Sequence, residues 1–260
     1  MQRLNLKNRK GQNIVGVLEI PEGEIKGTCI VQHGWGGNKE KSTVQAMKNG
    51  FLESGFQAFN FDATNTFGES DGDYEKSTLG LHWEDFEDVT KWVQQQDWFV
   101  GPLAITGHSK GGYAVARYAE EHPEEVGYVV PVAPVVSGEL SFKEYEARDP
   151  EGLKKWKEEG IIETTSDKEP GRVKRKHWFQ MEERLQHDLL PSVDKITMPV
   201  LLIVGSEDSS CLGQTKVLFD AIPGGNKEIK IIEGAPHSYY EQSEQEECTN
   251  AIKNWLNKQI

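Results

Sequence analysis

Short apolar runs alternate with amphipathic segments along most of the chain, and each predicts one kind of element. Short apolar runs bounded by polar or glycine-rich stretches are typical of buried strands. They predict strands at residues 4–7, 14–20, 28–32, 57–61, 102–106, 129–132, 200–204 and 229–232. Amphipathic stretches predict helices at residues 42–54, 83–98, 113–121 and 241–257. In the last of these, apolar residues recur from Cys248 to Leu256 with helical spacing, so one face should be buried.

Strands that alternate with helices indicate an α/β fold in which most strands run parallel. The first two strands are joined by the turn at residues 10–13 and should form an antiparallel hairpin at the edge of the sheet. Ligands of such sheets bind beyond the carboxyl ends of the strands. Ser109, Asp208 and His237 each follow a predicted strand, so we expect them to meet on one rim. The loop that follows the strand at 28–32 should join them there.

Residues 138–192 interrupt this alternation. The segment is rich in Lys, Glu and Arg, and no apolar run in it predicts a strand. We interpret it as a lid of helices and turns inserted into one α/β core, whose two parts are residues 1–137 and 193–260. The basic run at residues 172–177 could contact an acidic substrate, but a solvated face balanced by neighbouring glutamates is the preferred interpretation.

The sequence Gly-His-Ser-Lys-Gly at residues 107–111 carries the most specific chemical signal of the chain. It lies between the apolar run at 102–106 and the helical segment at 113–121. A serine with glycines two residues away on either side, at a turn from strand to helix, is typical of a nucleophile elbow. Such a turn holds the hydroxyl out toward a substrate, so we predict that Ser109 attacks an acyl carbon.

A serine hydroxyl needs a base within hydrogen-bond reach, and that base needs an orienting carboxylate. Asp208 is the preferred acid because it follows a strand and a glycine, and its neighbour Glu207 is the rival. Of the seven histidines, His237 is the one that follows both this acid and the end of a strand. The resulting chain order of Ser, acid and His is the order that accompanies such elbows. The predicted catalytic residues are therefore Ser109, Asp208 and His237.

The negative charge that develops on the carbonyl oxygen during acyl transfer needs hydrogen-bond donors. We predict the backbone N–H of Lys110, which directly follows the serine, and that of Trp35, in the glycine-rich run at 33–37. The other interpretation of this run is a phosphate-cradling loop, but the Gly-Lys-Ser/Thr ending of such loops is missing. The candidate substrate contacts are His33, Gly34, Gly36, His108, Trp156 and Trp178.

Charge and cysteine usage restrict the partners. The net charge of −13 argues against nucleic acid and disfavours anionic membrane surfaces. The three cysteines lie far apart and predict neither a metal site nor a disulfide framework. No apolar run is long enough for a transmembrane helix, and the first residues contain no apolar signal core. We therefore expect a cytoplasmic monomer or homodimer whose partner is a small molecule.

With these motifs, the chain resembles α/β-hydrolase-fold serine hydrolases over nearly its whole length. Within that fold it is similar to bacterial cinnamoyl (feruloyl) esterases and monoacylglycerol-lipase-like esterases. The resemblance implies a mostly parallel sheet of about eight strands with an inserted lid. It also implies a cofactor-free, metal-free carboxylic ester hydrolase for small to medium acyl or aryl esters. It rests on residues 33–37, 61–62, 68–72, 107–112, 205–208 and 236–237, while the loop at 62–68 is one residue longer than in such esterases and lacks their arginine.

Three other functions remain as alternatives. A serine peptidase of the same fold, of the acylaminoacyl or dipeptidyl type, would cleave amides instead of esters. A dehalogenase usually needs an aspartate nucleophile where this chain has Ser109. A non-catalytic binding protein would be marked by loss of a catalytic residue, and all three predicted ones are in place.

Overall fold

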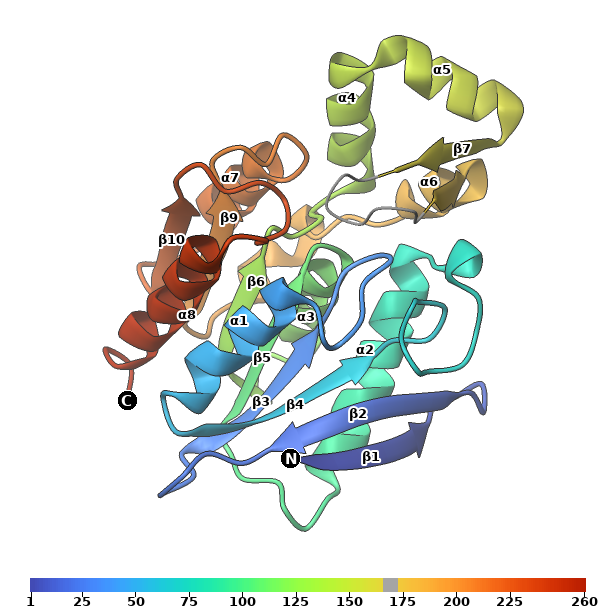
Figure 1. Cartoon of the computed structure of the whole chain (residues 1–260). Helices are drawn as coiled ribbons and strands as arrows, with labels where there is room; N and C mark the ends of the chain where they lie inside the picture. Colours follow the sequence, from blue (N-terminus) through green and yellow to red (C-terminus); the bar gives the residue numbers. More distant parts are fainter. Residues whose placement is uncertain (166–172) are drawn as a thin grey trace.

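The computed structural model describes residues 1–165 and 173–260 and is built around an eight-stranded sheet (Figure 1). The strand order is β1-β2-β4-β3-β5-β6-β9-β10. The pairs β1–β2 and β2–β4 are antiparallel, and the other neighbours are parallel. This confirms the predicted mostly parallel sheet and its N-terminal hairpin. The strands are β1 (Gln2–Lys7), β2 (Asn13–Glu19), β3 (Gly27–Gln32), β4 (Phe56–Asp62), β5 (Leu103–His108), β6 (Val126–Val132), β9 (Val200–Gly205) and β10 (Lys227–Ile232).

The sheet separates two hydrophobic cores. Side chains of β3 alternate between them, because successive residues of a strand point to opposite faces: Ile30 packs in one core and Val31 in the other. Strands buried on both faces read as continuous apolar runs, which is why the sequence predicted them. One core packs under α2 (Leu79–Gln94), α3 (Lys110–Glu121) and α7 (Leu212–Ala221), and the other under α1 (Ser42–Leu52) and α8 (Gln242–Leu256).

The helix boundaries differ most from the prediction at α2, which begins at Leu79 instead of Trp83. The side chain of Thr78 accepts a hydrogen bond from the Leu81 N–H, which caps the helix one turn earlier. The helix α7 was not predicted from the sequence. Its buried positions include Gln214 and Thr215, so an apolar stripe was hard to recognise. None of the helices in the described ranges is long and apolar enough to cross a lipid bilayer.

Between β6 and β9 the chain leaves the sheet and forms a separate layer beyond the carboxyl ends of the strands (Figure 1). This segment has its own small core, in which the rings of Trp156 and Trp178 meet at 5.4 Å. The expectation of helices and turns without strands was wrong, because β7 and β8 pair antiparallel. Its elements are α4 (Gly138–Arg148), α5 (Pro150–Glu159), β7 (Ile161–Thr164), β8 (Lys174–His177), α6 (Trp178–Arg184) and the short helix η2 (Leu190–Lys195).

Candidate active site

Ser109 occupies a strained turn between β5 and α3. Its backbone has φ 58° and ψ −112°, a conformation that a residue with a side chain rarely adopts. The surrounding backbone holds it there. The Ser109 N–H donates to the Val132 carbonyl at 2.9 Å, and its own carbonyl accepts from the N–H groups of Tyr113 and Val135. The turn places the hydroxyl at the carboxyl end of β5, as the elbow motif predicts.

The flanking glycines are required by close backbone contacts. A Cβ atom at Gly107 would lie 2.3 Å from the carbonyl oxygen of Gly111. A Cβ atom at Gly111 would lie 2.6 Å from the carbonyl oxygen of Gln32, on β3. Both distances are far below van der Waals contact, and the atoms met are backbone atoms that cannot rotate away. The glycines therefore allow α3 to begin directly against the sheet.

The structure brings the three predicted catalytic residues together. The His237 Nε2 lies 3.0 Å from the Ser109 Oγ, and its Nδ1 lies 2.7 Å from the Asp208 Oδ2. Asp208 follows β9 and its side chain is only 1% exposed, whereas the His237 side chain is 37% exposed. The rival Glu207 is exposed. The geometry thus favours Asp208 as the partner of the histidine.

The Asp208 carboxylate is fixed on both of its oxygens. The N–H groups of Ser210 and Cys211 donate to Oδ1 at 3.0 and 3.1 Å, while Oδ2 faces His237. Burial opposes the charged form, but the hydrogen bond from His237 and the Ser210 N–H outweigh it, so the pKa of Asp208 is lowered below its usual value. At neutral pH the residue is an oriented carboxylate.

His108 contacts His237 and fixes the loop that carries it. Its Nε2 lies 2.7 Å from the His237 carbonyl oxygen, and the two rings are 4.7 Å apart. Burial, followed by repulsion from His237, lowers the pKa of His108 to about 3. The ring is therefore neutral, and the proton on Nε2 is donated to the carbonyl. This arrangement holds the loop that carries His237.

His33, another candidate substrate contact, has no ring nitrogen left for a ligand. Its Nδ1 pairs with the Gly34 carbonyl at 2.7 Å, and its Nε2 accepts from the Ala63 N–H at 3.0 Å. Gly34 comes so close to the serine that a Cβ atom there would lie 2.9 Å from the Ser109 Cβ. His33 therefore anchors the glycine-rich loop against the nucleophile.

The two predicted oxyanion donors lie beside Ser109 in this arrangement. Lys110 is the first residue of α3, and the first N–H groups of a helix have no carbonyl partner within it. Trp35 belongs to the anchored loop, and Trp35, Ser109 and Lys110 line one cavity. The structure thus brings both residues to the cavity that holds Ser109.

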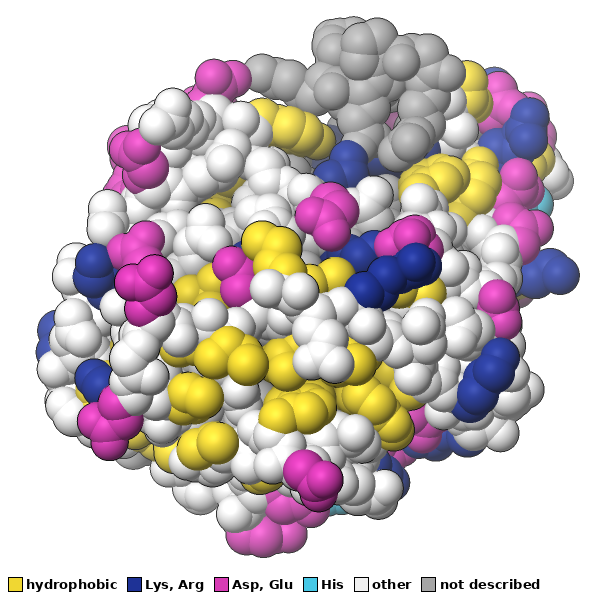
Figure 2. Space-filling model, turned by 60° about the horizontal axis from the view of Figure 1, so that its bottom comes forward, with side chains coloured by type: hydrophobic (Ala, Val, Ile, Leu, Met, Phe, Trp, Pro, Cys, Tyr) yellow, Lys and Arg dark blue, Asp and Glu magenta, His cyan; other side chains and the backbone are white. Residues whose placement is uncertain are grey.

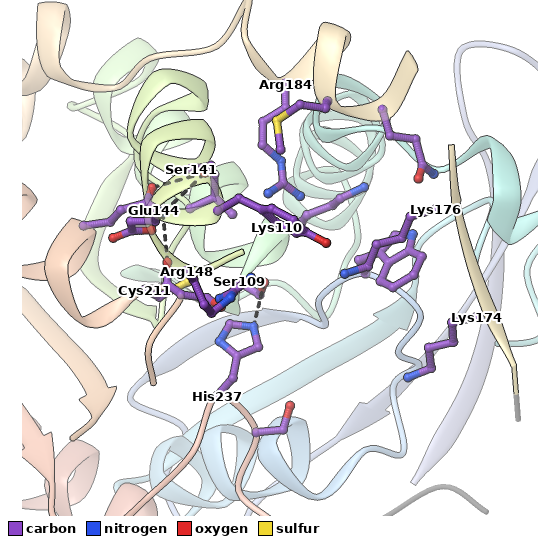
Figure 3. A pocket seen from close by; sticks show the side chains of 18 of the residues that line it. Ser109, Lys110, Ser141, Glu144, Arg148, Lys174, Lys176, Arg184, Cys211 and His237 are labelled. Atoms are coloured by element: carbon purple, nitrogen blue, oxygen red, sulfur yellow. Dashed lines mark hydrogen bonds between the residues drawn. The ribbon is translucent and has the colours of Figure 1, made fainter. Parts of the chain in front are cut away.

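A cavity of about 370 Å³ opens above Ser109, between the sheet and the inserted segment (Figure 3). Trp156 lines it and donates its Nε1–H to the Lys176 carbonyl, whereas Trp178 packs in the core of the inserted segment. Gly36 lines a smaller adjoining cavity of about 80 Å³. One described carboxylate lines the large cavity, that of Glu144. Five basic side chains also line it: Lys110, Arg148, Lys174, Lys176 and Arg184.

Sequence reasoning missed most of these basic residues. The preferred interpretation of the basic run at 172–177 as a solvated face is wrong for Lys174 and Lys176, which line the cavity, while Arg175 pairs outward with Glu163. Alternation of this kind is the signature of a strand. A prediction of β8 from the sequence would have placed Lys174 and Lys176 on one face of a strand and Arg175 on the other. Arg172, at the start of that run, lies outside the described residues.

One cluster in the site has ligand atoms close enough for a metal ion. Asp208, Cys211 and His237 each offer an atom within 4.8 Å of the others. The Asp208 oxygens are already occupied by His237 and two N–H groups, however. Burial, followed by repulsion from Asp208, raises the pKa of the Cys211 thiol well above its usual value, so the thiolate form that binds metals is disfavoured. The cluster fits a hydrogen-bonded acid and base better than a metal site.

A serine on a strained strand-to-helix turn, bonded to a histidine from the last loop of a mostly parallel sheet, defines the α/β-hydrolase fold. The family model described as serine aminopeptidase, S33 (Hydrolase_4) matches residues 23–244. The chain therefore belongs to this family and is a serine hydrolase of the α/β-hydrolase fold.

Known proteins and solved structures are similar to this chain over nearly its whole length. An "uncharacterized 31.7 kDa protein in traX-finO intergenic region" of Escherichia coli is 26% identical over 284 residues, covering 97% of this chain and 98% of that protein. Est1E from Butyrivibrio proteoclasticus, in a structure with ferulic acid bound, has a TM-score of 0.79 at 22% identity, over 99% of both chains. Mouse alpha/beta hydrolase domain-containing protein 10 has a TM-score of 0.79 at 21% identity, over 100% of both chains. At these identities the two structures establish the fold alone.

Proposed function

We propose that this protein hydrolyses carboxylic esters through an acyl-enzyme on Ser109. The observation that carries the proposal is the hydrogen-bonded chain from the Ser109 Oγ through His237 to Asp208, with distances of 3.0 and 2.7 Å. His237 Nε2 takes the hydroxyl proton as Oγ attacks the ester carbonyl. Asp208 holds the proton on Nδ1 and stabilises the imidazolium that forms.

The remaining steps use the same groups. The oxyanion accepts hydrogen bonds from the N–H groups of Trp35 and Lys110, and His237 returns its proton to the departing alcohol. Water then attacks the acyl-enzyme with His237 as base, and the acid is released as Ser109 is regenerated. In this mechanism the chain supplies every catalytic group.

The charge of the cavity favours esters over the peptides that an aminopeptidase would cleave. An aminopeptidase must accept the positively charged α-ammonium group of its substrate. Here five basic side chains and one carboxylate line the cavity in the described part of the chain. Like charges repel one another more strongly in a partly buried site than in water, so the α-ammonium group of a peptide would be poorly accommodated.

The proposed substrates are small to medium acyl or aryl esters, including cinnamoyl- and feruloyl-like ones. The volume of about 370 Å³ lies in the range of small-molecule sites. Trp35 and Trp156 supply flat apolar surface to the wall. The fold shared with Est1E, whose structure holds ferulic acid, motivates the aryl part of the proposal.

The test is hydrolysis of a chain-length series of p-nitrophenyl esters and of methyl ferulate. We expect Ser109→Ala to lower kcat by about five to six orders of magnitude. Ser243→Ala, at an exposed position of α8, is the matched control and should retain full activity. Equal activity of the Ser109 variant and the parent would overturn the mechanism. Turnover of amides without turnover of any ester would favour the peptidase alternative.

A further inference from the structure

Three basic side chains converge on the cavity from different elements without an acidic partner. Lys110 comes from α3, Lys176 from β8 and Arg184 from the end of α6, and all three line the cavity that holds Ser109 (Figure 3). No carboxylate of residues 1–165 or 173–260 lies within salt-bridge distance of any of them. Buried or half-buried charges are normally paired, so this arrangement calls for an explanation.

The hydrogen-bond partners of Lys110 are neutral, and Glu183, the one carboxylate that raises its pKa, is already bonded to His187 and to two backbone N–H groups. The Lys110 side chain is nearly fully buried, with 2% of the residue exposed, and Nζ lies 3.1 Å from the Ser77 carbonyl and 3.4 Å from the Ser77 Oγ. An ammonium group has three N–H donors, so at least one remains for a ligand. Burial, followed by repulsion from Arg184, lowers the pKa of Lys110 well below its usual value. An anion in the cavity would reverse that shift.

Lys176 and Arg184 show the same imbalance. The Lys176 Nζ lies over the Trp35 ring, 5.1 Å from its centroid. Burial lowers the pKa of Lys176 to about 8, and the charged groups that face it are all basic: Arg184, Arg148 and Lys174. Burial also lowers the pKa of Arg184, and the opposing effects of Cys211 and Glu183 do not offset it. Repulsion from each of these cations therefore makes the charged form of the others less favourable.

The excess of basic over acidic side chains in the cavity is opposite to the composition of the whole chain. Acidic residues outnumber Lys and Arg by 42 to 29. They are scattered over the face shown in Figure 2 instead of gathering in one patch. Glu144, the described carboxylate that lines the cavity, accepts a hydrogen bond from the Gln214 Nε2 at 2.7 Å, and the nearby Arg148 donates to the Ser210 Oγ. Neither neutralises the three cations.

We infer that the substrate is an anionic ester, which carries a carboxylate that Lys110, Lys176 and Arg184 bind while Ser109 attacks the ester carbonyl. This inference rests on the proposed esterase function and narrows its substrate class. In Figure 3, Lys110 and Arg184 lie on one side of Ser109 and His237 on the other. Since His237 must reach the departing alcohol, the carboxylate belongs to the acyl part of the ester.

The first test compares esters that differ in charge and by one methyl group. The acyl-side pair is 4-nitrophenyl hydrogen glutarate and its neutral methyl diester. The alcohol-side pair is the butyrate ester of 4-hydroxybenzoate and that of methyl 4-hydroxybenzoate. We expect kcat/KM to favour the glutarate anion over its methyl ester by about tenfold to a hundredfold, the range for a charge-assisted hydrogen bond. No preference within the acyl-side pair, or a preference confined to the alcohol-side pair, would overturn the inference.

Single substitutions test which residues cause the preference for the glutarate anion. Lys176→Met removes the charge at nearly the same side-chain length, and Arg184→Gln removes it with a shorter polar side chain. Each should lower kcat/KM for the glutarate anion about tenfold and leave the methyl ester within about threefold, since one charge-assisted contact is lost. Lys143→Met, on α4 at an exposed site paired with Glu139, is the control and should change neither. Equal losses on both esters would mean a structural role and would overturn the inference.

A binding measurement separates this inference from the catalytic one. Glutarate, titrated calorimetrically into the folded Ser109→Ala protein, should bind more weakly as salt is raised, and weaker still after Arg184→Gln. Hydrolysis of neutral esters without glutarate binding or anion preference would refute the anionic substrate and leave the esterase function standing. Glutarate binding without hydrolysis of any ester would refute the esterase function, and the ester with it, but leave the three cations as a carboxylate-binding site.

Discussion

Asp208→Asn tests the site most sharply, because the backbone around the carboxylate dictates how the amide must sit. The N–H groups of Ser210 and Cys211 donate to one carboxylate oxygen at 3.0 and 3.1 Å. In the variant, these donors hold the amide oxygen and turn the NH₂ group toward His237. A donor facing Nδ1 moves the ring proton to Nε2, where it points at the Ser109 hydroxyl. His237 can then no longer accept the serine proton.

The expected loss follows from that change of tautomer. A neutral histidine with its proton on the wrong nitrogen lowers kcat by about four orders of magnitude, or about 5.4 kcal/mol of transition-state stabilisation. The assay is steady-state hydrolysis of p-nitrophenyl butyrate at pH 7.5, with circular dichroism to confirm folding. Glu207→Gln changes the exposed neighbouring carboxylate and should leave kcat within about twofold, as surface substitutions usually do. A folded Asp208 variant that keeps more than a tenth of the parental kcat would refute this reasoning.

The other predictions concern the turn and the cavity. Gly111→Ala should lower the free energy of unfolding by about 1 to 3 kcal/mol, because its Cβ would lie 2.6 Å from the Gln32 carbonyl oxygen. The control is Gly225→Ala, whose Cβ would have no atom within 4 Å. Equal melting temperatures of the two variants would contradict the argument. The ratio of kcat/KM for the glutarate anion to that for its methyl ester should fall as the pH rises through about 8, where Lys176 loses its proton. The ratio cancels the titration of the shared catalytic groups. A ratio that stays flat from pH 6.5 to 9.5 would exclude Lys176 as the anion-binding cation.

The candidate catalytic residues could be selected from the sequence because their signals are local in it. The elbow needs glycines at fixed positions around the serine, since Gly107 and Gly111 meet backbone atoms closely. Asp208 follows β9, whose apolar sequence is plain because the strand is buried on both faces. His237 follows the edge strand β10, where three isoleucines among Lys and Glu still indicate a strand. Parallel strands then bring these loops to the same edge.

The lining of the cavity could not be predicted in the same way. Arg148, Lys176 and Arg184 meet through the tertiary packing of the inserted segment, and no local pattern relates them. The strand β8 consists of Lys174–His177, four residues without an apolar side chain, so periodicity analysis had nothing to detect. A basic residue in such a segment looks the same in sequence whether it faces solvent or Ser109.

The proposed catalytic residues and two of the three proposed anion-binding cations come from separate parts of this fold. Ser109, Asp208 and His237 follow strands of the sheet, held by backbone contacts that the α/β-hydrolase fold itself requires. Lys176 and Arg184 come from the segment inserted between β6 and β9, which contributes no strand to that sheet. Substitutions in the inserted segment can alter the charge of the cavity without disturbing the acid and base below it.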